Sequence, residues 1–315
     1  MFDRFKSNKP GDPPEDGIVV LRQSKPYTCG GTDATLDTKA PTTIESGQMV
    51  SFSVHTAFGG VVSPETHEYQ GPLLSYLFAF AVPAGSGTFL FLETRTDFDR
   101  QRSVQHALVK ADVMPSLVRL VHELELAQKN GRHSTTYGLP QNFGGSVDIC
   151  YASGETISFS DNQTPILPEK TGRAIAALFT EALAGEAVAP PDLSGLRAIR
   201  FEEDRGESGF TRAELTLTAD GAGVNKKTSR YEDRVYESEK PVDAPTVEAI
   251  KNNIERCDMF AWVDLPRSRY AVGSEKTMTF VFADGTEITV TNQKALPSAL
   301  SGGFFNIELE LTTKH

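Results

Sequence analysis

Apolar positions along the chain follow two different periods, and each period predicts one type of element. In residues 49–56, Val50, Phe52 and Val54 alternate with polar residues, which is the two-residue period of a half-buried strand. Residues 73–82 and 88–95 are largely apolar and are joined by a glycine-rich turn. We therefore expect these three segments to form an antiparallel meander, with a further strand near residues 17–23.

A helical period first appears in residues 112–129. Asp112 is the expected N-cap, Pro115 falls in the first turn and Gly131 marks the end of the helix. The apolar residues at helical spacing are Leu117, Leu120, Val121, Leu124 and Ala127. A β-hairpin is predicted next, in residues 146–160, and a second helix in residues 168–183.

The same order of elements recurs about 130 residues later. The helical pattern of residues 243–257 repeats the proline and the apolar spacing of 112–127, and residues 277–293 repeat the glycine-centred hairpin with Asn-Gln after it. Residues 304–311 fit either a strand or a helix, and the match to 168–183 favours a helix.

This repetition predicts an α+β fold built by internal duplication of one unit, in which an antiparallel sheet is combined with helices. Each unit would contain strands, a helix, a β-hairpin and a terminal helix. Residues 184–194 have the alanine and proline content of a linker. The predicted domains are an N-terminal extension with a flexible leader (1–47), a first repeat (48–190) and a second repeat (191–315).

One block of the first repeat resembles a known group of sequences. It contains AxxNG at 127–131, GLP at 138–140, YASGE at 151–155 and DNQ at 161–163, in that order. With these motifs it resembles uncharacterised tandem-repeat proteins of anaerobic gut bacteria. The resemblance implies kinship but no mechanism, and the second repeat departs from the pattern because it has ADGTE for ASGET and lacks GLP.

Charge and composition exclude several classes of function. The net charge is -11 and no segment clusters lysine and arginine without acidic neighbours, so neither nucleic acid nor an anionic membrane is an expected partner. The chain as given contains no apolar stretch typical of a signal peptide or a membrane span. Its three scattered cysteines predict a reducing compartment, and we expect a cytoplasmic protein without metal or cofactor.

The residues that follow the outgoing strand of each predicted hairpin are the first candidates for binding. They are Asp161, Asn162 and Gln163 in the first repeat and Asn292 and Gln293 in the second. Their side-chain donors and acceptors could bind a peptide backbone or a sugar, but Asn and Asp in such positions also cap turns. Trp262, the single tryptophan, is either an interface anchor or a core residue.

Candidates for catalysis are weaker. Asp97 and Asp99 alternate near His106, and Cys29 precedes two glycines, but neither set has the spacing of a known catalytic motif. The leading hypothesis is a non-catalytic binding or scaffold protein that recognises a peptide or protein partner; the sequence does not indicate an oligomeric state. The alternative is an enzyme with an active site between the repeats, which would draw on Asp97, Asp99, His106 or His133 from the first repeat and on Asp264, Arg267 or Arg269 from the second.

Overall fold

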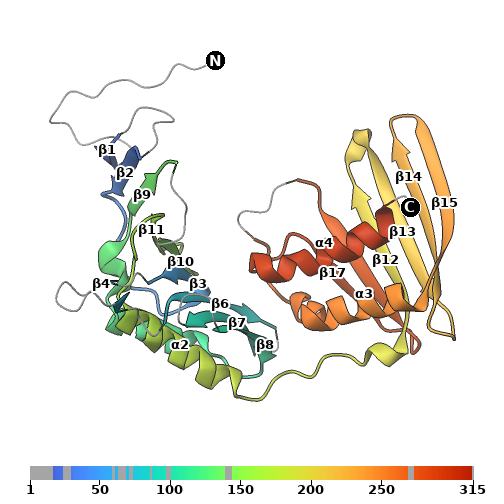
Figure 1. Cartoon of the computed structure of the whole chain (residues 1–315), viewed down its shortest axis with the longest axis horizontal. Helices are drawn as coiled ribbons and strands as arrows, with labels where there is room; N and C mark the ends of the chain where they lie inside the picture. The colour runs from blue at the N-terminus through green and yellow to red at the C-terminus, as the bar shows by residue number, and fades with distance from the viewer. Residues whose placement is uncertain are drawn as a thin grey trace. The chain divides into compact units, whose positions relative to one another are not determined.

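The structure, a computed structural model, divides into two compact units (Figure 1). Unit 1 comprises residues 1–83 and 90–186, and unit 2 comprises residues 84–89 and 187–315. The boundary between residues 186 and 187 lies inside the predicted linker. The residues described are 17–23, 30–58, 61–62, 69–70, 74–85, 87–96, 101–138, 144–268 and 273–313.

Unit 1 is built on a nine-stranded sheet with the order β1-β2-β9-β11-β10-β3-β6-β7-β8, and only the adjoining ends of β6 and β7, within residues 84–89, are grouped with unit 2. The strands are β1 (Ile18–Arg22), β2 (Thr32–Asp37), β3 (Met49–Ala57), β6 (Tyr76–Ala84), β7 (Gly87–Thr96), β8 (Gln101–Val109), β9 (Arg132–Thr136), β10 (Gly145–Tyr151) and β11 (Thr156–Asp161). Helices α1 (Met114–Glu123) and α2 (Glu169–Leu183), the short 3-10 helix η1 (Leu126–Lys129) and a separate pair, β4 (Val61–Val62) and β5 (Tyr69–Gln70), complete it. Strands β1 and β2, within the predicted extension 1–47, join this sheet through the pairing of β2 with β9.

Unit 2 contains a six-stranded antiparallel sheet with the order β15-β14-β13-β12-β16-β17. The strands are β12 (Leu196–Asp204), β13 (Gly209–Leu217), β14 (Gly223–Tyr231), β15 (Arg234–Val242), β16 (Lys276–Phe282) and β17 (Glu287–Thr291). The helices are α3 (Ala244–Arg256) and α4 (Ser298–Thr312), with the 3-10 helices η2 (Leu193–Gly195), η3 (Gly206–Ser208) and η4 (Met259–Trp262). The mixed content of both units agrees with the predicted α+β class.

Six strands of unit 1 have the same connectivity as the whole sheet of unit 2. The order β11-β10-β3-β6-β7-β8 corresponds strand for strand to β17-β16-β12-β13-β14-β15. A bulge occupies the same place in both sheets: the register shifts between Cys150 and Tyr151 where β10 pairs with β3, and between Leu196 and Ala198 where β12 pairs with β16. Six strands of the nine-stranded sheet, in which β11 also pairs with β9 in parallel, therefore share their order and a bulge with the sheet of unit 2.

The core of unit 2 lies on one face of its sheet, whereas in unit 1 the central strands β6 and β7 are buried on both faces. In β12 and β16, Ile199, Phe201, Met278 and Phe280 are buried and alternate with exposed or half-buried residues. Helix α4 packs against β13 and β14, and α3 packs against α4. The opposite face of this sheet carries exposed ion pairs such as Arg200 with Glu214 at 3.3 Å, as expected for a face in contact with water.

Local signals predicted most helices and hairpins but not every boundary. The helix expected over 112–129 is interrupted at Glu125, whose φ of 51° is left-handed, so α1 ends earlier and η1 follows it. Its N-cap is Val113, while Asp112 accepts a hydrogen bond from the Met114 amide at 3.1 Å. The helix favoured for the C-terminal segment is confirmed as α4. Strands β14 and β15 were not predicted, because their charged residues obscure the alternation.

Candidate functional site

The side chain of Asn162 holds the backbone of a neighbouring strand. Its Oδ1 accepts a hydrogen bond from the Thr136 amide at 2.7 Å, and its Nδ2 donates to the Thr136 carbonyl at 2.8 Å. Asp161 accepts from the amides of Gln163 and Thr164, both at 2.7 Å. These contacts lie within unit 1 and use the polar groups that the sequence suggested for binding.

The corresponding residues of unit 2 make similar contacts. Oδ1 of Asn292 accepts from the Lys276 amide at 2.9 Å, and its Nδ2 donates to the Ser274 carbonyl at 3.4 Å. Gln293 is buried and its Nε2 donates to the Gly273 carbonyl at 3.3 Å. Asn162 binds β9, which lies outside its hairpin, whereas Asn292 binds the start of the first strand of its own hairpin. Both side chains bind backbone groups, as the capping alternative raised by the sequence requires.

We expect Asn162→Ala to lower the free energy of unfolding by about 1–3 kcal/mol, because it leaves both backbone groups of Thr136 without their partner. Urea unfolding followed by circular dichroism measures this change. Asn306→Ala, at an exposed position of α4, is the control and should change stability by less than about 0.5 kcal/mol. Unchanged stability for Asn162→Ala would contradict the capping role and return Asn162 to the candidates for ligand binding.

Trp262 lies in the core of unit 2. Its side chain has no exposed surface, and its indole Nε1 donates a hydrogen bond to the Cys257 carbonyl at 3.1 Å. The neighbouring Phe260 contacts Phe280 edge to face, with ring centroids 5.1 Å apart. Burial of this kind is typical of a packing residue, since an interface anchor needs an accessible surface.

Of the residues considered for catalysis, His106 lies on β8 and His133 on β9 of unit 1, and Asp264 and Arg267 belong to unit 2. His133 Nδ1 is 3.0 Å from Ser160 Oγ, and the ring of His106 stacks on Phe91 with centroids 6.4 Å apart. The candidates Cys29, Asp97, Asp99 and Arg269 lie outside the described residues. Within the described part of the chain, no group of three His, Cys, Asp or Glu residues is placed to hold a metal ion.

A cluster around Glu93 in unit 1 was not anticipated from the sequence. Glu93 is buried, and its Oε1 accepts from Arg95 at 3.1 Å and from Arg102 at 3.0 Å. The Arg95 guanidinium lies over the Tyr76 ring, 4.7 Å from its centroid. Burial lowers the pKa of the nearby His55, an effect that Glu93 opposes. Glu93 and Arg95 lie two residues apart on β7, and strand pairing brings the residues of β3, β6 and β8 beside them.

The described part of unit 1 also contains a hollow of about 550 Å³, and its lining is largely polar. It is bordered by β2, β9, β11 and the turn between β10 and β11, and its lining includes Asp37, Lys39, His133, Glu155 and Ser158. The Glu155 side chain has a structural role. Its carboxylate accepts hydrogen bonds from the amides of Glu45 and Ser46, each at 3.0 Å, and these bonds lower its pKa.

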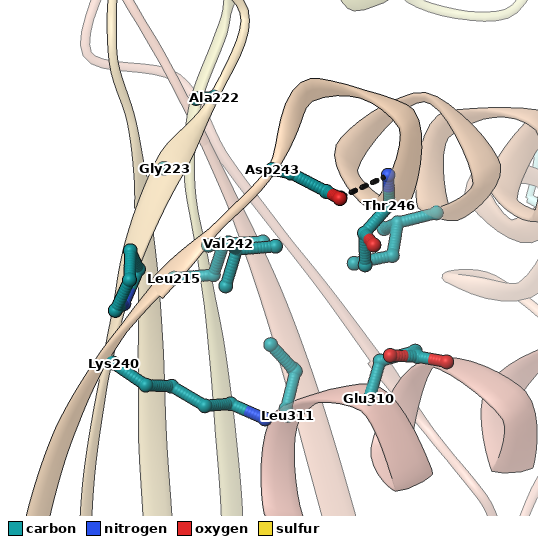
Figure 2. A pocket seen from close by; sticks show the side chains of 11 residues that line it. Leu215, Ala222, Gly223, Lys240, Val242, Asp243, Thr246, Glu310 and Leu311 are labelled. Carbon is teal, nitrogen blue, oxygen red and sulfur yellow. Dashed lines mark hydrogen bonds between the residues drawn. The ribbon is translucent and has the colours of Figure 1, made fainter. Parts of the chain in front are cut away.

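Unit 2 has a pocket of about 470 Å³ between the sheet and the ends of its two helices (Figure 2). Its apolar lining comes from β13, β15, the turn before β14 and both helices, and consists of Leu215, Ala222, Pro241, Val242, Ile250 and Leu311. Figure 2 shows Lys240, Asp243, Thr246 and Glu310 around this lining. An apolar lining with a few charged groups around it is typical of a site that receives one bulky side chain or a small amphipathic molecule.

The charged residues around the pocket hold the helix ends in place. Asp243 caps α3 by accepting a hydrogen bond from the Thr246 amide at 2.9 Å, and this interaction lowers the pKa of Asp243. At the C-terminus of α4, Asn225 Nδ2 donates to the Leu311 carbonyl at 2.9 Å, and Lys227 and Lys240 donate to the carbonyls of Thr312 and Thr313. Donors placed on the last carbonyls of a helix stabilise its C-terminus. The pocket is therefore bounded by anchored elements.

Comparison with known proteins identifies no relative: no family model matches the chain, and no curated protein is similar to it. None of the described helices is long and apolar enough to cross a membrane.

Proposed function

We propose that the chain is an internal duplication of one α+β unit. The shared strand order and the matching bulge support this proposal. Further support comes from the two hairpins, because Gly154 and Gly285 have left-handed φ angles of 89° and 86°. In each hairpin this glycine amide donates to a carbonyl three residues earlier, on Tyr151 and on Phe282 respectively. Order, register and turn geometry agree over most of each unit.

We propose that the duplicated protein is a non-catalytic binding or scaffold protein for a peptide or protein partner. The observation that carries this proposal is the pocket of unit 2, whose apolar lining suits an aliphatic or aromatic side chain of the partner. Its charged residues, Lys240 and Asp243, already serve the helix ends, which agrees better with recognition than with turnover. The free thiols of Cys150 and Cys257 support action in a reducing compartment such as the cytoplasm.

Selection from a random peptide library tests this function. The chain should enrich peptides that share an apolar position, and Ala222→Phe should lower the affinity for them roughly tenfold or more, because the ring would fill the pocket. Ala299→Phe, at an exposed position of α4, is the matched control and should bind normally. Failure to enrich any peptide pattern would overturn the proposed function, and equal binding by both variants would move the site away from this pocket.

A further inference from the structure

Strand β15 forms one edge of the sheet of unit 2. It pairs with β14 along nine residues, and no other described strand pairs with it. Residues 234–239 are all exposed, including Val235 at 58% and Tyr236 at 43%. An exposed edge strand of this length offers backbone donors and acceptors to an extended peptide.

The helices do not cover this strand as they cover its neighbours. Helix α4 packs against β13 and β14, whereas in β15 only Lys240 and Val242 are half-buried. Both of these residues line the pocket described above. Because side chains alternate along a strand, Tyr236 shares the pocket side with them, while Glu237 and Glu239 point to the opposite face.

The charged residues near this edge favour some binding partners over others. Residues 232–243 contain five acidic side chains and two basic ones. Glu239 is 3.5 Å from Lys226 in an exposed pair, and Glu237 has no ion-pair partner among the described residues. Antiparallel pairing of two copies of β15 about Ser238 would place Glu237 opposite Glu239 twice, and pairing about Glu237 would place that residue opposite itself. Like charges directly opposite destabilise a sheet, which disfavours a second copy of this chain.

We infer that β15 binds an extended peptide that carries lysine or arginine, as an added strand. The peptide's basic side chains would lie against Glu237 and Glu239, and its apolar side chains would lie on the other face, along Tyr236 and into the pocket. Pro241 has no N–H, so backbone pairing is confined to the preceding part of β15. This inference rests on the proposed function and specifies the class of partner and the strand that receives it.

Isothermal titration with a short peptide of alternating valine and lysine tests the inference. We expect binding to the full chain, together with slower amide exchange in residues 234–240, and no binding of the matched valine and glutamate peptide. The double variant Glu237→Lys, Glu239→Lys should weaken binding roughly tenfold or more by reversing the local charge. Glu287→Lys, on the opposite edge strand β17, is the control and should bind within about twofold of the natural chain.

Three results would overturn the inference: no binding of the lysine peptide, equal weakening by Glu287→Lys, or protection from exchange outside β15. These results differ from a failure of the proposed function. Library selection that yields apolar but non-basic peptides would support the proposed binding function and contradict the binding of a basic peptide at β15. Selection that yields no pattern would contradict both proposals.

Discussion

Replacing Trp262 by alanine is expected to lower the free energy of unfolding of unit 2 by about 3–5 kcal/mol, the range for large buried aromatic side chains. The side chain has no exposed surface, so its removal leaves a cavity and also removes the hydrogen bond to the Cys257 carbonyl. Hydrogen exchange followed by mass spectrometry measures the effect by segment. Exchange should accelerate in α3 and β16 of unit 2.

Trp262→Phe provides the matched control, because it keeps an aromatic ring in the same place. It should lose roughly half as much stability as Trp262→Ala or less. If Trp262→Ala instead abolished partner binding and left exchange unchanged, Trp262 would be an interface anchor, contrary to its burial.

Glu93→Ala is expected to lower the free energy of unfolding of unit 1 by about 3 kcal/mol. The substitution removes the buried carboxylate that accepts hydrogen bonds from two guanidinium groups, so the charges of Arg95 and Arg102 lose this anionic partner. The value lies at the lower end for buried pairs, because the side chains of Arg95 and Arg102 are 35% and 55% exposed and water would screen part of the loss. Urea unfolding followed by circular dichroism measures the change.

Glu202→Ala supplies the comparison for this prediction. Glu202 pairs with Arg212 at 3.5 Å, and both side chains are more than half exposed, so its removal should cost less than about 1 kcal/mol. Equal effects of the two substitutions would show that the Glu93 cluster behaves as a surface ion pair.

Much of the fold could be predicted from local patterns. The apolar spacing of residues 243–257 and the glycine of each hairpin placed α3 and both hairpins close to their observed positions. The edge strand β15 was not predicted, because its sequence does not alternate between apolar and polar residues. The structure shows that its first six residues are exposed. Its pairing with β14 makes it a strand, and that pairing is a property of the sheet.

The candidate sites show the same division. The sequence placed Asn162 and Asn292 after their hairpins, but only the structure showed that both side chains bind neighbouring backbone. The sequence also contained no signal for the pocket, whose lining comes from β13, β14, β15, α3 and α4. These elements are far apart in the chain and meet only when the sheet and helices pack.

For this protein, the sequence by itself determined the types of most elements and the α+β class. These properties depend on the period of apolar residues and on turn chemistry, both of which act over a few residues. The tertiary structure decided which strand became an edge, which carboxylate was buried and where a pocket formed. Those outcomes depend on pairing and packing between distant segments, and on the cost of leaving charges and backbone groups without partners.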